Sequence, residues 1–116
     1  MFKLIPNPTF TVDVNLSVPD GASTGTVKMT FRHQRRKALD AWIRMPQEAA
    51  EKGAELLDVD YLGNQIVSWE GVQDEDGTPV EFTKQTFAGF LDSYPAAGRE
   101  IFEVYVKSLT ESRAKN

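Results

Sequence analysis

Two stretches in the first third of the chain alternate strictly between apolar and polar residues. FTVDVNLSV at 10–18 has apolar side chains at the even positions, and TVKMTFR at 26–32 has them at the odd positions. Because successive side chains of a strand point to opposite faces, this period of two predicts two strands with one buried face each. PDGASTG at 19–25 has the composition of a turn. We therefore predict a β-hairpin whose apolar face must be covered by the rest of the chain.

The period then changes to that of a helix. Leu39, Trp42 and Ile43 have helical spacing and predict an amphipathic helix over 35–45. Pro46 is expected to end this helix because it has no N–H to donate, although it can also begin a new helical turn. A second helix is predicted over about 54–69, weakened by a central glycine, with these apolar residues on one side: Leu56, Val59, Leu62, Ile66 and Trp69.

Two further helices are expected in the last third of the chain. Thr83 can cap a helix that carries Phe87, Phe90 and Leu91. After an interruption at Tyr94-Pro95, a last helix is predicted over about 96–112, followed by a polar tail. The fold class is therefore α+β, with an N-terminal antiparallel hairpin or small sheet packed against about four helices. We expect a single domain over 1–116, with its β part at 1–33 and its helical part at 34–116.

Composition narrows the possible functions. The chain has 116 residues, a net charge of -4 and no cysteine. Disulfides, thiolate metal sites and cysteine nucleophiles are thereby excluded, and a reducing cytoplasm is the expected compartment. The modest acidity gives no general attraction to nucleic acid or anionic lipid. No apolar run approaches the roughly 18–20 residues that span a bilayer, and the N-terminal residues do not resemble a signal peptide.

The acidic stretch DEDG at 74–77 invites comparison with a calcium loop. If Gly77 were the sixth loop position, Val72 would be the first and Thr83 the twelfth, so two required oxygen ligands are missing. Asp-Gly is instead a strong turn signal. The carboxylates of the chain also show no sign of the burial or charge coupling that acid–base catalysis needs. We therefore predict a turn here, and no metal or catalytic site.

A basic cluster, RHQRRK at 32–37, lies between the predicted hairpin and the first helix. It contains the only histidine, His33, which without cysteines argues against a zinc site. No sequence motif for an activated nucleophile accompanies it. The cluster is either a solvated surface turn or a contact for an acidic protein surface, with Arg35 and Arg36 as the candidate contact residues. No aromatic residues interleave with the basic ones, which argues against nucleic acid.

Aromatic residues concentrate in the C-terminal half. Trp42 and Trp69 lie on predicted apolar helix faces, where packing in the core is expected. Aromatic area beyond what a small core needs would mark a binding surface, and core packing is the alternative. The candidate partner-binding residues are Trp69, Phe87, Phe90 and Tyr94. Nothing in the sequence predicts a cofactor.

The order of four segments resembles the tail assembly chaperones of long-tailed bacteriophages and prophages. The segments are TFRHQRRKALDAWI at 30–43, IVSWEGV at 66–72, DEDGTPVEFT at 74–83, and FAGFLDSYPAAGREIFEVYVKSLTESRAKN at 87–116. The most specific part is the block WxGVxDxDGxPVxF followed by Leu-x-x-Tyr-Pro. The resemblance covers nearly the whole chain.

The resemblance implies a protein that is not an enzyme. Such chaperones bind the long, aggregation-prone tape measure protein, keep it soluble and recruit tail tube subunits in the cytoplasm of the host bacterium. The resemblance leaves open whether the chain forms a homo-oligomer. It also leaves open whether a longer form is made by a ribosomal frameshift near Lys115-Asn116. Two alternatives remain: a structural tail completion or connector subunit that stays in the particle, and a toxin–antitoxin or regulatory module that uses the cluster at 32–37.

Overall fold

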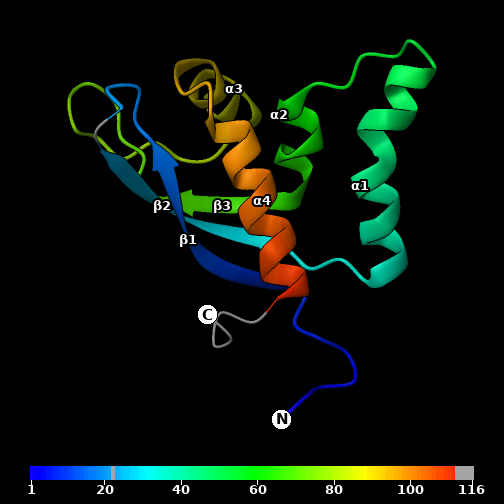
Figure 1. Cartoon of the computed structure of the whole chain (residues 1–116). Coiled ribbons are helices and arrows are strands. Elements are labelled where there is room, and N and C mark those ends of the chain that lie inside the picture. Colours follow the sequence, from blue (N-terminus) through cyan, green and yellow to red (C-terminus); the bar gives the residue numbers. More distant parts are fainter. Residues whose placement is uncertain (22, 112–116) are drawn as a thin grey trace.

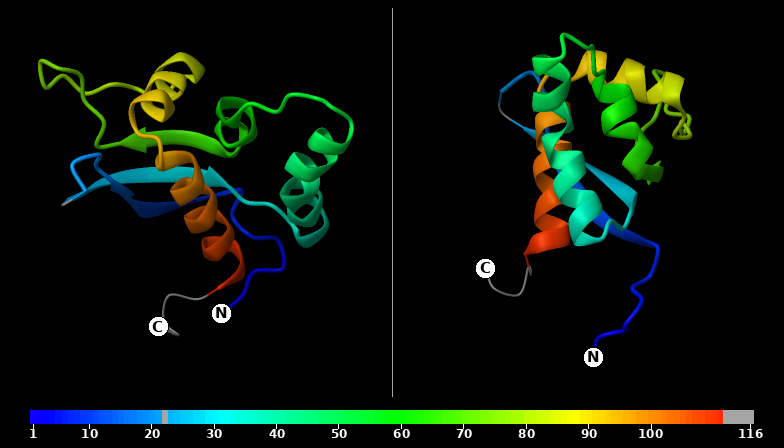
Figure 2. Two further views of the ribbon diagram at one scale, coloured as in Figure 1. Left: turned by 45° about the horizontal axis from the view of Figure 1, so that its top comes forward. Right: turned by 90° about the vertical axis from the view of Figure 1, so that its right-hand side faces the viewer.

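The computed structural model describes residues 1–21 and 23–111. Three strands form an antiparallel sheet in the order β1-β2-β3, and α4 crosses one face of it (Figures 1 and 2). This confirms the predicted α+β class. The elements in chain order are β1 (Thr9–Ser17), β2 (Thr24–Arg32), α1 (Arg36–Glu51), α2 (Asp58–Tyr61), the 3₁₀ helix η1 (Gly63–Gln65), β3 (Ile66–Glu70), α3 (Lys84–Ser93) and α4 (Ala97–Thr110).

The predicted hairpin is confirmed by β1 and β2. Phe10 pairs with Phe31 and Val14 pairs with Val27, so the apolar residues of both strands lie on the same face. The opposite face is polar and is joined by cross-strand hydrogen bonds between side chains, such as the 2.8 Å contact between the Thr11 and Thr30 hydroxyls. The sheet thus has one face in the core and one in solvent.

The buried face of the sheet is covered by α4. Ile101 and Tyr105, one helical turn apart, are almost completely buried. The Tyr105 ring lies 4.9 Å from that of Phe31, measured between centroids. Its hydroxyl donates to the carbonyl oxygen of Arg32 at 2.7 Å and accepts from Nε2 of Gln34 at 3.1 Å. The helix is therefore fixed both to the sheet and to the junction that follows it.

The prediction of one helix over 54–69 is wrong. The segment forms the short helices α2 and η1 and then the strand β3, which pairs with β2. The register shifts between Thr30 and Phe31, so that Val67 is an extra residue in the ladder. Because of this bulge, Ile66 and Trp69 both face the core while the two residues between them are exposed. A bulged strand therefore produced the spacing of three that predicted a helix.

The prediction that Pro46 ends the first helix is also wrong, since α1 continues through it to Glu51. A proline at this position removes the donor that would normally reach the carbonyl of Trp42, four residues earlier. The Tyr61 hydroxyl supplies the missing hydrogen bond, donating to that carbonyl at 2.6 Å. In return, Trp42 Nε1 donates to the Tyr61 carbonyl at 3.1 Å, and the two rings stack at 4.3 Å. A distant tyrosine thus replaces the helical donor.

The last two predicted helices are confirmed as α3 and α4. Thr83 is the N-cap of α3, as expected. The end predicted for the last helix, Ser112, and the polar tail lie outside the described residues. Among the helices of the described chain, none is both long and apolar enough to cross a membrane.

The exchange between Trp42 and Tyr61 can be tested with a double-mutant cycle. Tyr61→Phe leaves the Trp42 carbonyl without its donor, and we expect a loss of about 1–3 kcal/mol in the free energy of unfolding. In a Pro46→Ala background, the backbone regains an N–H at position 46 that can donate to that carbonyl, so the same change should cost much less. Urea unfolding followed by circular dichroism measures both values.

Tyr94→Phe is the matched control, because within the described residues the Tyr94 hydroxyl has no hydrogen-bond partner. An equal cost of Tyr61→Phe in both backgrounds would show that its hydroxyl does not compensate for the proline.

Candidate functional site

The start of α3 is fixed by hydrogen bonds among threonines. The Thr83 hydroxyl accepts from the Thr86 N–H at 3.0 Å, and the Thr86 hydroxyl oxygen accepts from the Thr83 N–H at 2.9 Å. The Thr86 hydroxyl also donates to the carbonyl of Glu81 at 2.8 Å. This reciprocal capping satisfies backbone donors that the first turn leaves free. It sets the direction in which α3 leaves the preceding loop.

Two of the predicted partner-binding residues belong to the core. Trp69 is 6% exposed and Phe87 is fully buried. Their rings pack edge to face at 6.0 Å, and Trp69 Nε1 donates to the Val80 carbonyl at 2.8 Å. Phe82 packs against both rings. In this structure these buried side chains pack α3 against β3.

The other two aromatic residues of the set, Phe90 and Tyr94, are half-buried and line a groove. Their rings lie 4.9 Å apart at the end of α3. They form a wall shared by two adjoining hollows of about 480 and 120 Å³. We call these hollows together the α3 groove. It is lined by α3, by the loop at 71–75 and by the facing ends of the hairpin at 16–18 and 25–27.

Gly71 lies at the junction of the two hollows. Its φ angle is 104°, a conformation that side chains other than glycine rarely adopt. An added Cβ would also lie 3.0 Å from the backbone oxygen of Thr26. The close approach of the two backbones here fixes the floor of the groove.

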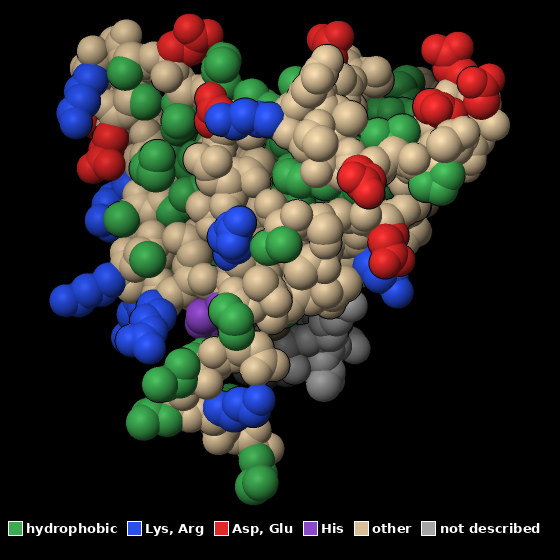
Figure 3. All heavy atoms as spheres, turned by 180° about the vertical axis from the view of Figure 1, so that it is seen from behind, with side chains coloured by type: hydrophobic (Ala, Val, Ile, Leu, Met, Phe, Trp, Pro, Cys, Tyr) green, Lys and Arg blue, Asp and Glu red, His purple; other side chains and the backbone are tan. Residues whose placement is uncertain are grey.

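The rim of the groove is acidic. Asp74 and Glu75 line it, and its lining residues include no lysine or arginine. Figure 3 shows acidic side chains gathered at the corner formed by the 71–80 loop, with basic side chains along the opposite side. The groove therefore combines an aromatic wall with negative charge, which favours an apolar segment that carries a basic residue.

The predicted turn at 74–77 is confirmed. The Asp74 carboxylate accepts from the N–H groups of Asp76 and Thr78 at 2.9 and 3.0 Å. Gly77 has a φ of 82° and completes the turn. Among the described residues, no group of acidic or histidine side chains is arranged to hold a metal ion.

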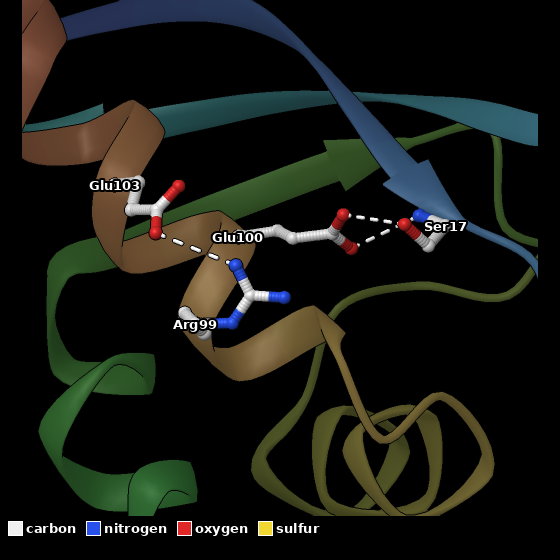
Figure 4. A network of polar contacts seen from close by, with 4 residues as sticks. All are labelled: Ser17, Arg99, Glu100 and Glu103. Carbon is white, nitrogen blue, oxygen red and sulfur yellow. Dashed lines mark hydrogen bonds and ion pairs between the residues drawn. The ribbon is translucent and has the colours of Figure 1, made fainter.

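A carboxylate fixes the hairpin side of the groove. Glu100, in the first turn of α4, reaches the end of β1 (Figure 4). Its Oε1 accepts from the Ser17 N–H at 2.9 Å and its Oε2 accepts from the Ser17 hydroxyl at 2.6 Å. The bond from the Ser17 hydroxyl, and to a smaller extent the bond from the Ser17 N–H, lower the pKa of Glu100 below its ordinary value of 4.5. Because Ser17 lines the smaller hollow, this contact holds one wall of the groove in place.

The basic residues Arg35 and Arg36 lie at the start of α1, and both are exposed. Figures 1 and 2 place that end of α1 on the other side of the molecule from the groove, so the structure does not bring the two predicted sites together. Arg32, in the same cluster, donates through Nε to the carbonyl of Asn64 at 3.1 Å. At least one of these cations therefore has a structural role.

A second hollow, of about 270 Å³, was not predicted. It lies between α1, α2 and α4, and its apolar lining includes Pro46, Leu56 and Phe102. Tyr61 also lines the hollow. Its burial, and to a smaller extent the nearby Asp58 carboxylate, raise the pKa of this tyrosine to about 12. The hydroxyl that donates to Trp42 therefore stays protonated at neutral pH. The sequence pattern carried no signal for this hollow, because Pro46 was predicted to end the first helix and residues 58–62 were predicted to lie in one long helix.

The fold and the groove define a small α+β protein that presents an aromatic, acid-rimmed surface. The family model described as phage tail assembly chaperone matches residues 1–116. The chain therefore belongs to the phage tail assembly chaperone family, the family that the order of its sequence segments resembles. No curated protein and no solved structure matches the chain.

The contact between Glu100 and Ser17 gives a prediction for acid. Glu100→Gln puts an amide where two donors expect a carboxylate, so the protein should be less stable at neutral pH. The folded-state pKa of Glu100 is lowered, so its contribution is complete above the unfolded value of about 4.5 and is lost as pH falls through the folded value. Urea midpoints of the wild type and the variant should therefore converge in acid.

Glu103→Gln is the control, because Glu103 forms only a 3.5 Å exposed ion pair with Arg99 (Figure 4). A difference between wild type and Glu100→Gln that persists undiminished well below pH 4.5 would contradict the account.

Proposed function

We propose that this chaperone binds the tape measure protein of its phage, keeps it soluble and helps to recruit tail tube subunits. The observation that carries the proposal is the match to the chaperone family over all 116 residues. The protein acts by binding and not by catalysis, in the cytoplasm of the bacterial host.

We further propose that the tape measure protein is held at the α3 groove. The larger hollow, of about 480 Å³, falls within the range of about 300–1,000 Å³ that is typical of ligand pockets. Phe90 and Tyr94 supply the kind of aromatic contact that dominates binding energy at interfaces. A long, aggregation-prone partner exposes apolar segments, and the groove can cover them one at a time. Asp74 and Glu75 favour segments that carry a lysine or arginine beside the apolar anchors.

Gly89 allows the groove to be blocked without disturbing the core. It lines the larger hollow, and an added Cβ meets nothing within 4 Å. Gly89→Trp should fill the hollow with a ring, whereas Gly89→Ala leaves most of it open and favours the helix by up to about 1 kcal/mol. The pair changes the same position in opposite ways.

The test is co-expression of each variant with the tape measure protein of the same genome, followed by pull-down. We expect Gly89→Ala to keep the tape measure protein soluble and Gly89→Trp to reduce the recovered complex by about tenfold or more. Val67→Asp, on an exposed strand position, is the control for a surface change elsewhere. Circular dichroism confirms that each variant is folded.

Two results would overturn parts of the proposal. If the wild-type protein leaves the tape measure protein aggregated and is itself found in purified particles, it is a structural tail subunit. If Gly89→Trp binds as well as Gly89→Ala, the partner uses another surface.

A further inference from the structure

The first five residues form an arm whose apolar side chains are left uncovered by the described part of the chain. Met1, Phe2, Leu4 and Ile5 are 124%, 105%, 98% and 70% exposed. The base of the arm is fixed, because the His33 N–H donates to the carbonyl of Pro8 at 2.9 Å. Several large apolar side chains exposed close together along the chain are typical of a segment that is covered in a complex.

The arm leaves the molecule at the end of the sheet that is remote from the α3 groove. It precedes Thr9, where β1 begins, whereas the hairpin residues that line the groove lie at 16–18 and 25–27. The nearest of these, Val27, pairs with Val14, which is about 20 Å along the strand from Pro8 at roughly 3.3 Å per residue. Folded back from Pro8, the chain could carry Phe2 about 20 Å but Leu4 only about 14 Å, at roughly 3.4 Å per residue. The arm therefore cannot place both Phe2 and Leu4 in the groove of its own chain.

The arm matches the groove of a second copy in shape and charge. In the structure the arm bends at residues 4–5, and Lys3 Nζ donates to Asn7 Oδ1 at 3.0 Å. When the arm is extended in a groove, Phe2 and Leu4 point to one side and Lys3 is released to the other. The two adjoining hollows, of about 480 and 120 Å³, offer separate sites for a large and a smaller apolar side chain. Lys3 supplies the positive charge that the rim at Asp74 and Glu75 lacks.

We propose that the arm of one copy, residues 1–5, occupies the α3 groove of a second copy. Each copy then gives an arm and offers a groove, so the contact is heterologous and joins copies head to tail. The arm also competes with the tape measure protein, which makes it an internal inhibitor of partner binding. This inference rests on the α3 groove being the binding surface of the proposed function.

A peptide of residues 1–8 with a fluorescent label at its C-terminus tests the contact directly. Its anisotropy should rise on titration with the full chain carrying Leu4→Asp, which has an intact groove and a defective arm. Adding Gly89→Trp to that chain should weaken binding by about tenfold or more, while Gly89→Ala should not. Equal binding to both Gly89 variants would overturn the assignment to this groove.

Charge reversal tests the register. A peptide with Lys3→Glu should bind the Leu4→Asp chain more weakly and should recover on a chain that also carries Glu75→Lys. A Lys3→Glu peptide that binds as tightly as the natural one, with no response to Glu75→Lys, would contradict pairing of the two charges.

Mixing two defective chains tests the head-to-tail geometry. Leu4→Asp and Gly89→Trp should each be monomeric in analytical ultracentrifugation, because one lacks the arm contact and the other lacks the groove. Together they retain one intact arm and one intact groove, so the mixture should form a one-to-one dimer that grows no further. The wild type should form larger species as its concentration rises. A monomeric wild type, or a mixture that stays monomeric, would overturn the proposal.

These outcomes are separate from those of the proposed function. If the peptide binds and the mixture dimerises while the tape measure protein stays aggregated, the proposed function fails and the arm contact stands. If Leu4→Asp solubilises the tape measure protein no better than the wild type, the arm does not compete for the groove.

Discussion

The buried ring of Tyr105 holds α4 against the sheet and against the junction that follows β2. Burial raises the pKa of this phenol, and the Gln34 side chain and the Arg32 carbonyl satisfy its hydroxyl. Trp42 meets the same ring edge to face at 5.2 Å, which brings α1 to the core. Because Trp42 in turn exchanges hydrogen bonds with Tyr61, one aromatic cluster determines where α1, α2 and α4 lie.

The groove follows from a second aromatic cluster that is only partly covered. Phe87 and Phe90 on α3 and Tyr94 at its C-cap have a spacing of three and four, so the sequence could group them. Their burial differs in the structure. Phe87 is fully buried against Trp69 of β3 and Phe82, whereas Phe90 and Tyr94 are half-buried and line the groove toward the hairpin. A prediction that makes β3 a helix cannot draw that distinction. The sequence thus grouped the aromatic candidates, and burial in the structure separates Trp69 and Phe87 in the core from the half-buried Phe90 and Tyr94.

The fold was predictable where local pattern decides it. Strict alternation was enough for β1 and β2, and the threonine cap with its aromatic spacing was enough for α3. The failures have non-local causes. The bulge at Val67 arises from pairing with β2, and it gave β3 the residue spacing of a helix. The α1 helix continues through Pro46 with a hydrogen bond from the Tyr61 hydroxyl, which belongs to another helix.

We propose that the tape measure protein binds at the α3 groove while the aromatic cores stay closed. Hydrogen–deuterium exchange, compared between the chain alone and the chain bound to the tape measure protein, distinguishes this surface from others. We expect slower exchange on binding in the loop at 71–75, in α3 and at the facing hairpin end near Ser17, with α1 unchanged. Protection confined to the residues around the second hollow, at 44–57, with the groove unaffected, would contradict it.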